Sequence, residues 1–504
     1  MRNYDQVLET ARKAFSLGKT RSVSFRKQQL KNLLRLFLEN EKEILNALNA
    51  DLRKCSFEGK LGECENLKSE VKHMLRNLDH YSAPETLPLN LLAFLDRGYI
   101  QREPFGVVLV IGTWNYPFNL SLQPLIGALA AGNCVILKPS EVAPRSAETM
   151  AKLLPKYLDA ECYQVVLGGA EDTQQLLRHR FDYIFYTGSS SVGRIISTAA
   201  AVNLTPVTLE LGGKSPCFID DDADCRLAAK RILWGKVMNL GMTCIAPDYV
   251  LCSKQVETEF VKVAKEVLEE WYGPNLQKSG DLPRFPNQKQ LMRLTKMLEA
   301  TKGRVVVGGE SNPEGLWLDP TIVVDVDGRD SLMEPQNEIF GPILPIVNVG
   351  CLEEAIQFIN ARPKPLALYI FARSNSKCER MLEQTSSGGA CVNDVIWHNL
   401  WPGLPFGGVG DSGQGSYHGK SSFDTFSHKK SVLVRGFGYF SEKLGEARYP
   451  PYNDSSLRFF TFLVKYFEAS NVNINHINSS HIISAIFGAV FLFAILYAFN
   501  LVCV

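Results

Sequence analysis

The sequence predicts an α/β protein built on doubly wound parallel sheets. From about residue 105 onward, short apolar runs alternate with stretches of helical periodicity. This alternation is typical of parallel sheets whose two faces are both covered by helices. At 504 residues the chain is too long for one ordinary core, so two or three packed units are expected.

The composition is that of a soluble globular enzyme, with 45% hydrophobic and 21% charged residues. A net charge of +1 gives no electrostatic reason to expect a nucleic-acid partner. The twelve cysteines lack metal-ligand spacing and have no histidines clustered beside them. Free thiols in a reducing compartment are therefore predicted, and no metal site. The first residues contain no apolar run of the kind found in a secretory signal peptide.

The first half of the chain is predicted to be a nucleotide-binding domain. Residues 6–50 should be helical, because apolar residues recur at three- and four-residue spacing. Helices of 1–80 and a Rossmann-type unit at 105–208 would form this domain, with a bridging segment at 81–104 between them. The predicted strands are GVVLVIG (106–112), NCVILKP (133–139), YQVVLGG (163–169), DYIFYTG (182–188) and TPVTLELGG (205–213). Ligands of such a domain bind beyond the carboxyl ends of its strands.

A second α/β stretch, 209–415, is predicted to be a catalytic domain. It contains helical runs such as ETEFVKVAKEVLEEWY and strand-like runs such as YVLC and LALYIFA. Residues 416–440 would form a second bridging and dimerisation segment. Residues 441–481 lose the α/β rhythm, contain two consecutive prolines and many Asn and Ser residues, and predict a linker.

The chain ends in an uncharged apolar segment, 482–504, whose clearly polar side chains are Ser484 and Asn500. As a helix it reaches about 34 Å, enough to cross a hydrocarbon core of about 30 Å. We therefore expect a transmembrane tail anchor; a buried core helix is the alternative. Arg448, Arg458 and Lys465 precede the segment, which favours a cytosolic catalytic part. The endoplasmic reticulum is the expected membrane, with the peroxisome and the mitochondrial outer membrane as alternatives.

The two most distinctive motifs are TLELGGKSP (208–216), which contains Glu210, and MNLGMTCIAPDYVLC (238–252), which contains Cys244. Five more accompany them: WNYPF (114–118), KPSE (138–141), YTGSSSVG (186–193), NEIFGP (337–342) and LPFGGVGDSG (404–413). Together they resemble the motifs of the aldehyde dehydrogenase superfamily, in the same order, over about residues 5–435. SSGGACVNDVIWH (386–398) and RYPPY (448–452) resemble the class-3 enzymes, and among these the membrane-bound fatty aldehyde dehydrogenases.

The resemblance implies a covalent mechanism. Cys244 would be the nucleophile, because a thiolate adds readily to a carbonyl carbon. The side-chain amide of Asn115 and the backbone N–H of Cys244 would hold the oxyanion. Glu210 would activate the water that hydrolyses the thioester, so that a carboxylate is released. Each residue also has a simpler interpretation. Cys244 could be a core thiol, Glu210 a solvated residue at a strand end, and Asn115 a turn former before a proline.

The resemblance also implies a cofactor site. Gly188, Ser189 and Gly193 belong to a turn entering a helix, where backbone N–H groups meet a pyrophosphate. Lys138 and Glu141 follow a strand and would bond the adenine ribose. NAD is expected, since a glutamate there disfavours a 2′-phosphate, and NADP is the alternative. The remaining cofactor residues implied are Trp114, Leu211, Glu338 and Phe340.

The predicted substrate is a long-chain fatty aldehyde, because the resemblance is to fatty aldehyde dehydrogenases and the apolar tail would place the enzyme at a membrane, where such aldehydes concentrate. Medium-chain or aromatic aldehydes, acyl transfer to coenzyme A or phosphate, and a catalytically silent membrane protein are the alternatives.

A homodimer is expected through a strand within 417–435. His398 and His418 are predicted to be structural, Cys252 a structural thiol at a strand end, and Lys214 a surface residue; Met242 stands where relatives usually have glutamine. The candidate substrate-wall residues are Trp397, Leu400, Trp401 and Leu404.

Overall fold

The computed structural model describes residues 4–87 and 96–468. Its chain clusters into two compact units, Met1–Ser82 with Glu103–His428, and Ala83–Arg102 with Lys429–Val504. Both predicted α/β stretches therefore fall within the first unit. The boundary between them at residue 209 stays a prediction.

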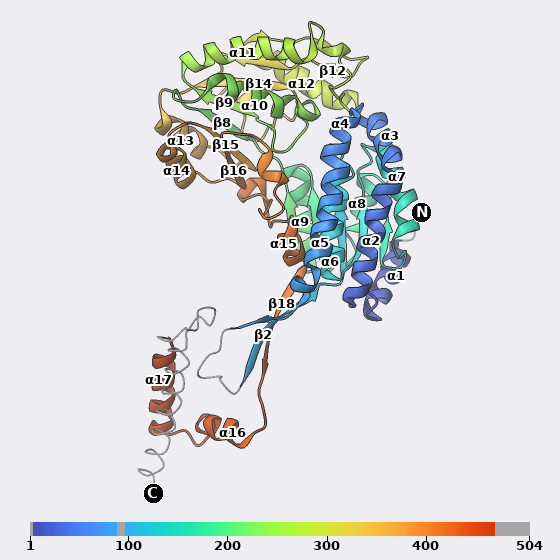
Figure 1. Cartoon of the computed structure of the whole chain (residues 1–504), viewed down its shortest axis with the longest axis vertical. Helices are drawn as coiled ribbons and strands as arrows, with labels where there is room; N and C mark the ends of the chain where they lie inside the picture. The colour runs from blue at the N-terminus through green and yellow to red at the C-terminus, as the bar shows by residue number, and fades with distance from the viewer. Residues whose placement is uncertain (1–3, 88–95, 469–504) are drawn as a thin grey trace. The chain divides into compact units, whose positions relative to one another are not determined.

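The N-terminal segment is helical, as predicted, but it is divided into several helices. They are α1 (Tyr4–Ser16), α2 (Val23–Glu39), α3 (Glu41–Leu52), the short α4 (Ser56–Gly59) and α5 (Asn66–Ser82), with a π-helical turn at Lys60–Glu65. Ser22 begins α2 by accepting a hydrogen bond from the Phe25 N–H, as an N-cap residue does. In α5, Leu67, Val71, Met74 and Leu78 form one buried stripe. Helices α2 and α5 pack side by side (Figure 1).

The first sheet has six strands in the order β17-β7-β6-β3-β4-β5. Its strands are β3 (Val107–Ile111), β4 (Cys134–Lys138), β5 (Tyr163–Val165), β6 (Tyr183–Thr187), β7 (Val207–Glu210) and β17 (Gly413–Gln414). All neighbours are parallel except β17 with β7. Every residue of β3, β4 and β6 is buried, as expected for a sheet covered on both faces. All five predicted strands are thus confirmed, each slightly shorter than its apolar run.

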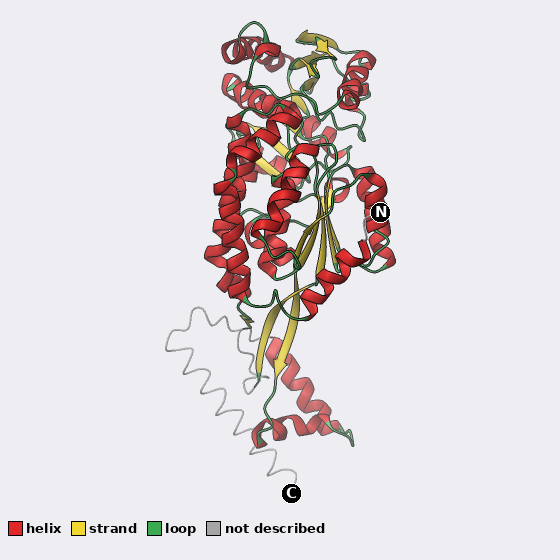
Figure 2. Ribbon diagram, turned by 90° about the vertical axis from the view of Figure 1, so that its right-hand side faces the viewer, coloured by secondary structure: helices red, strands yellow, loops and turns green. Residues whose placement is uncertain are grey.

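Helices connect these strands and cover the sheet, which Figure 2 shows between red helices. They are α6 (Asn119–Ala131), α7 (Pro144–Tyr157), α8 (Ala170–Leu176) and α9 (Ser190–Val202). Helix α6 is buried on all sides, so it runs through the core of the unit. It ends at Gly132, whose φ of 96° lies in the left-handed region that favours glycine.

The second sheet has seven strands in the order β10-β13-β14-β9-β8-β15-β16. They are β8 (Pro216–Ile219), β9 (Tyr249–Cys252), β10 (Arg304–Val307), β13 (Thr321–Val324), β14 (Ile343–Asn348), β15 (Ala367–Phe371) and β16 (Gly389–Val392). Its helices are α10 (Cys225–Val237), α11 (Lys254–Tyr272), α12 (Gln288–Ala300), α13 (Leu352–Asn360) and α14 (Asn375–Gln384). A small hairpin, β11 (Ser311–Asn312) and β12 (Trp317–Leu318), and the short α15 (Gly419–Thr425) complete the unit. The second α/β stretch is therefore confirmed.

The smaller unit contains most of the predicted bridging segment 81–104 and the second half of the predicted segment 416–440, whereas 416–428 belongs to the first unit. Its strands β1 (Glu85–Thr86), β2 (Arg97–Pro104) and β18 (Ser427–Val434) form a three-stranded sheet in the order β1-β2-β18. Strand β18 is thus an edge strand. Two helices follow it, α16 (Tyr439–Gly445) and α17 (Asp454–Glu468).

The described part of 441–481, which the sequence predicted to be a linker, contains the end of α16 and the whole of α17. Its role as a linker stays a prediction. The two prolines end the preceding turn. Asn453 then begins a helix by accepting a hydrogen bond of 2.8 Å from the Ser456 N–H. The predicted anchor at 482–504 lies outside the described residues. Within 4–87 and 96–468, no helix is both long and apolar enough to cross a bilayer.

Candidate active site

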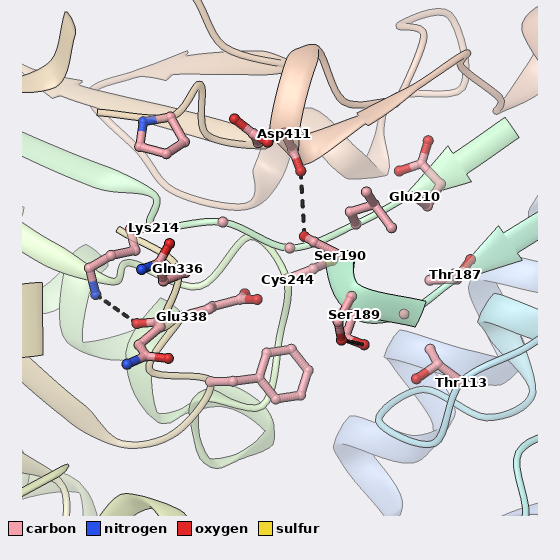
Figure 3. Close-up of a pocket in the computed structure, with 18 of the residues that line it drawn as sticks. Thr113, Thr187, Ser189, Ser190, Glu210, Lys214, Cys244, Gln336, Glu338 and Asp411 are labelled. Carbon is pink, nitrogen blue, oxygen red and sulfur yellow. Dashed lines mark hydrogen bonds between the residues drawn. The ribbon is translucent and has the colours of Figure 1, made fainter. Parts of the chain in front are cut away.

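One cavity of about 590 Å³ collects most of the residues that the sequence motifs single out. Its walls come from the segments after β3, β6 and β7, the segments before β9 and β14, and the glycine-rich segment around Asp411. The predicted site residues that line it are Cys244, Glu210, Asn115, Trp114, Gly188, Ser189, Leu211, Glu338 and Phe340. Figure 3 shows Glu210, Cys244 and Glu338 around this space. Residues from both sheets thus share one cavity.

Cys244 is half-buried and lies between the 3-10 helix Met238–Gly241 and strand β9. The chain reaches it through an unusual turn, in which Asn239 and Leu240 have left-handed φ values of 49° and 51°. Gly241 also has a positive φ, and a Cβ there would lie 2.3 Å from the carbonyl oxygen of Gly341. Burial, with the nearby Glu338 and Glu210 carboxyls, raises the pKa of the Cys244 thiol. The resting thiol is therefore protonated, and its activation requires a proton acceptor.

Glu210 is the last residue of β7, and only 3% of its surface is exposed. Neither carboxyl oxygen has a hydrogen-bond partner among the described residues. Burial raises the pKa of Glu210 well above its usual value. A buried carboxyl without partners is a stronger base when ionised than a solvated one, which suits it to accept a proton.

Asn115 is buried, and its side-chain amide donates a hydrogen bond of 3.0 Å to the backbone carbonyl of Met242. An amide nitrogen has two hydrogens, so one remains for another acceptor. The backbone carbonyl of Asn115 accepts hydrogen bonds from Lys54 at 3.0 Å and from the Asn239 side chain at 2.9 Å. These two hydrogen bonds therefore fix the Asn115 peptide through its backbone carbonyl.

Met242, which the sequence left uninterpreted, has two separate roles. Its side chain is fully buried in the core cluster that also contains Leu240 and Tyr249. Its backbone carbonyl accepts the side-chain amides of both Asn115 and Asn239, each at 3.0 Å. The methionine side chain thus packs in the core, and any residue at this position supplies the same carbonyl.

The turn after β6 presents a helix N-terminus to the cavity. Ser189 precedes α9, but its side chain makes no cap and instead lies 3.2 Å from the Ser191 hydroxyl. The first-turn N–H groups of α9 are therefore left for an anion. A Cβ at Gly188 would lie 2.2 Å from the Tyr186 hydroxyl, so the turn requires glycine. Gly193 does not line the cavity; its hydrogen allows α9 to pack on Leu211.

Lys138 and Glu141 lie just beyond β4 and form an ion pair of 3.0 Å. The lysine is buried and the glutamate is exposed. Neither belongs to the cavity wall. Their assignment to the adenine ribose stays a prediction.

Glu338 and Phe340 enter the cavity from the segment before β14. Burial, with the Asp248 carboxylate beside it, raises the pKa of Glu338 to about 8. Phe340 has a left-handed φ of 48° and meets Trp114 edge-on, with ring centroids 5.5 Å apart. Arg293 holds this segment by donating to the backbone carbonyls of Glu338 and Ile339.

The prediction that Lys214 is a surface lysine is wrong. It is buried in an ion pair with Asp248 and also donates to the backbone carbonyls of Leu332 and Asn337. Figure 3 shows Lys214 near Glu338. The other oxygen of Asp248 accepts the Ile339 N–H at 3.0 Å. This pair therefore fixes the segment that carries Glu338. The sequence signal was the lysine's place between a double glycine and a buried strand.

The two histidines lie outside the cavity wall. His418 stacks on Phe406 with ring centroids 5.0 Å apart, and burial lowers the pKa of His418 to about 3. Burial also lowers the pKa of His398 to about 4. Its ring nitrogens have no partner in the part of the chain that the structure describes, so the predicted hydrogen bonding is not seen there. Trp397, Leu400, Trp401 and Leu404 are exposed and do not line this cavity, whereas Cys252 is buried at the end of β9 as predicted.

The cavity fits a dinucleotide. It combines a helix N-terminus without a side-chain cap, a glycine turn and a buried carboxyl, and its volume lies in the range of small-molecule sites. These features occur on a Rossmann-like sheet whose ligands bind at the carboxyl ends of the strands. A cysteine and a carboxyl share the same space. Such a fold and site are those of a nicotinamide-dependent oxidoreductase.

Comparison with known proteins gives the family. The profile of the aldehyde dehydrogenase family matches residues 1–432. Human aldehyde dehydrogenase family 3 member B1 is 51% identical over 452 residues, covering 90% of this chain and 95% of its own. The rat family 3 member A2 is 48% identical over 471 residues, covering 93% and 96%. A substrate-bound structure of Staphylococcus aureus AldH is 40% identical, covers 92% of this chain and all of its own, and gives a TM-score of 0.87.

The chain belongs to the aldehyde dehydrogenase family. It is an NAD(P)-dependent enzyme, and its curated relatives above are members of family 3.

Proposed function

We propose that this enzyme oxidises long-chain aldehydes to carboxylic acids, with NAD as the preferred acceptor, through a covalent adduct on Cys244. The observation that carries the mechanism is the shared cavity: Cys244, Glu210 and Asn115 line it together, although they come from three separate segments. The retained nucleophile and base also argue against a catalytically silent protein. The base argues against acyl transfer to coenzyme A or phosphate, because activation of water is needed only for hydrolysis.

The first step is addition of the thiol to the aldehyde. The raised pKa of Cys244 means that its proton must leave as the carbon–sulfur bond forms. The carboxylate form of Glu210 lines the same cavity and is one acceptor, and solvent water is the other. The carbonyl oxygen becomes an oxyanion. It is stabilised by the free amide hydrogen of Asn115 and by the backbone N–H of Cys244.

The residues that would hold the oxidant line the same cavity. Gly188 and Ser189 would receive the diphosphate at the N-terminus of α9, Glu338 the nicotinamide ribose, and Phe340 with Trp114 the ring. Once bound, the cofactor supplies the oxidation by accepting hydride from the substrate carbon. The carbon is then a thioester of Cys244.

Hydrolysis completes the cycle. Glu210 first releases to solvent any proton that it took from the thiol; it then takes a proton from a water molecule, and the hydroxyl adds to the thioester carbon. The carbon–sulfur bond then breaks, the acid is released, and Cys244 recovers its proton. The raised pKa of Glu210 fits this role, because a base of higher pKa removes the proton of water more readily.

A long-chain substrate is proposed from the apolar segment 482–504 and the likeness to family 3. Each buried methylene favours the lipid phase by about 0.8 kcal/mol, so long aldehydes concentrate in the bilayer. An anchored active site would meet them there. Medium-chain and aromatic aldehydes remain the competing substrates.

The test is a chain-length series of kcat/KM, measured on the full chain in detergent with NAD and with NADP. We expect kcat/KM to rise with chain length and to be greater with NAD. A maximum at short or aromatic aldehydes would reject the fatty substrate and leave the mechanism intact. Cys244→Ala is the control, and unchanged oxidation by this variant would reject the mechanism itself.

Location and assembly are proposed from the remaining segments. The tail at 482–504 would anchor the enzyme in the endoplasmic reticulum with its catalytic unit in the cytosol. Microscopy of the chain with and without the tail tests this, and an unchanged distribution would reject it. Strand β18 forms a sheet edge, whose backbone groups suit pairing with a second copy. Cross-linking in detergent should show a dimer; a monomer would reject this assembly.

A further inference from the structure

A fully buried ion pair contacts the backbone of Asn115. Lys54 and Glu63 are 3.1 Å apart, and both side chains have zero exposed surface. Burying a charged pair costs desolvation free energy that an apolar pair would not, so such a pair is weak support for stability alone. Neither residue lines the cavity. Their contacts therefore indicate what the pair does.

Both members of the pair hold the chain around Asn115. The Lys54 ammonium donates to the Asn115 backbone carbonyl at 3.0 Å and lies 4.1 Å from the centre of the Tyr116 ring. The second oxygen of Glu63 accepts the backbone N–H groups of Phe118 at 2.9 Å and Asn119 at 3.0 Å. The segment from Asn115 to the start of α6 is thus held at both ends by one buried pair.

The same N-terminal region holds the turn before the nucleophile. The Glu58 carboxylate accepts the Asn239 N–H at 3.1 Å. The Asn239 side chain in turn donates to the carbonyls of Asn115 and Met242. A shift of the Asn115 peptide would therefore break contacts with Lys54 and Asn239 together.

We propose that Lys54 is a positioning residue for the oxyanion: its ammonium fixes the Asn115 peptide so that the side-chain amide points at the oxygen of a carbonyl bound to Cys244. This rests on the role proposed above for Asn115. It adds that the helical N-terminal segment, which the sequence assigned to nucleotide binding, also sets the geometry of the site formed by Cys244 and Asn115. A misplacement of about 1 Å in such a site can reduce a rate about 100-fold.

The test variant is Lys54→Met combined with Glu63→Gln, because removing the lysine alone would leave a buried carboxylate without its partner. Two rates are measured. One is aldehyde oxidation, and the other is hydrolysis of para-nitrophenyl acetate, which acylates a reactive thiol and needs no cofactor. Calorimetric binding of NAD+ and the Tm of each variant are measured beside them.

We expect both rates to fall about 10- to 100-fold, as for a slightly misplaced catalytic group, while NAD+ affinity is retained. A change in kcat with little change in KM is expected, because the oxyanion contact forms only as the reaction proceeds. Lys68→Met is the matched control, since Lys68 is also buried and paired with glutamates but donates to Glu41 and Glu65 rather than to the Asn115 carbonyl. It should leave both rates unchanged.

A second variant covers the case in which the double variant folds poorly. Asn239→Ala removes the other donor to the Asn115 carbonyl and leaves the ion pair in place. The same pattern, at smaller amplitude, is expected: lower rates of both reactions with unchanged NAD+ affinity. Unchanged rates in whichever of the two variants is folded would overturn the proposal.

A double-mutant cycle with Asn115→Ala separates positioning from a structural role. If Lys54 acts through Asn115, the pair substitution should cost little further rate in an Asn115→Ala background. Full additivity would show that Lys54 acts elsewhere and would overturn the inference alone. Unchanged rates in Asn115→Ala by itself would overturn the proposed role of Asn115, and the inference with it.

Discussion

The side-chain amide of Asn115 donates to the backbone carbonyl of Met242, two residues before the nucleophile, across 3.0 Å. This bond joins the segment after β3 of the first sheet to the segment before β9 of the second. It also orients the Asn115 amide, because one of its two hydrogens bonds the Met242 carbonyl and the other stays available for another acceptor. The distance between the Asn115 amide and Cys244 is therefore set by backbone atoms as well as by side-chain packing.

The first prediction concerns this amide. Asn115→Asp keeps the shape of the side chain but replaces the donor with an acceptor that faces a carbonyl and a developing oxyanion. We expect kcat for aldehyde oxidation to fall about 100- to 1,000-fold, the usual cost of losing an oxyanion donor. Steady-state NADH absorbance measures the rate. Asn66→Asp, outside the cavity, is the control, and equal losses in the two variants would contradict the assignment.

The second prediction concerns the base. Glu210→Gln keeps the volume of a buried side chain that has no hydrogen-bond partner in the described structure. The thioester should still form but hydrolyse slowly, with the steady-state rate at least about 100-fold lower. Stopped-flow fluorescence should show a burst of about one NADH per subunit, and mass spectrometry an acyl group on Cys244. The absence of both would mean that Glu210 is needed before the thioester forms.

The sequence was sufficient for the parallel strands of the first sheet and for β9 and β15 of the second, because buried parallel strands are continuous apolar runs. GVVLVIG contains β3, YVLC coincides with β9, and LALYIFA contains β15. The motifs also named nine residues of the cavity wall. Glu210 ends β7 and Asn115 follows β3, where parallel sheets place their ligands, whereas Cys244 precedes β9.

Long-range polar contacts could not be predicted. Lys214 was predicted to be a surface lysine and Lys54 was not singled out, because a lysine is rarely buried unless it is paired. Their acceptors lie far along the chain: the Asn115 carbonyl for Lys54, and Asp248 for Lys214. Helix α17 was missed because prolines, Asn and Ser dominate the region before it. The two lysine contacts have no local periodicity that would reveal them.

The third prediction separates the two roles of Met242. Met242→Ala should lower the free energy of unfolding by about 2–5 kcal/mol, as other buried methionines do when truncated. The folded fraction should retain most of its kcat, because the carbonyl that accepts Asn115 belongs to the backbone. Chemical unfolding and steady-state kinetics on the same sample measure both. Met292→Ala, at a site that is 51% exposed, is the control and should be nearly neutral. A large loss of kcat at unchanged stability would contradict this separation.

The last prediction is a pH dependence. The pKa of Glu338 is raised to about 8, so at pH 7 most of this carboxyl is protonated. A carboxylate accepts a hydrogen bond from a ribose hydroxyl more strongly than the neutral acid does. As pH rises through 8 the carboxylate form increases, and binding of NAD+ should tighten. Ionisation rises from about a tenth to about nine tenths between pH 7 and 9, so Kd should fall up to about tenfold.

Calorimetry of NAD+ binding across this range is the measurement, and Glu338→Gln decides the assignment. Lys236 is buried nearby and its pKa is lowered to about 8, so it titrates in the same window. It loses its positive charge as pH rises, and that loss would also favour a positively charged nicotinamide. If Glu338 is responsible, Glu338→Gln flattens the profile and Lys236→Met keeps the slope. The reverse pattern would assign the dependence to Lys236, and weaker binding at high pH would contradict both assignments.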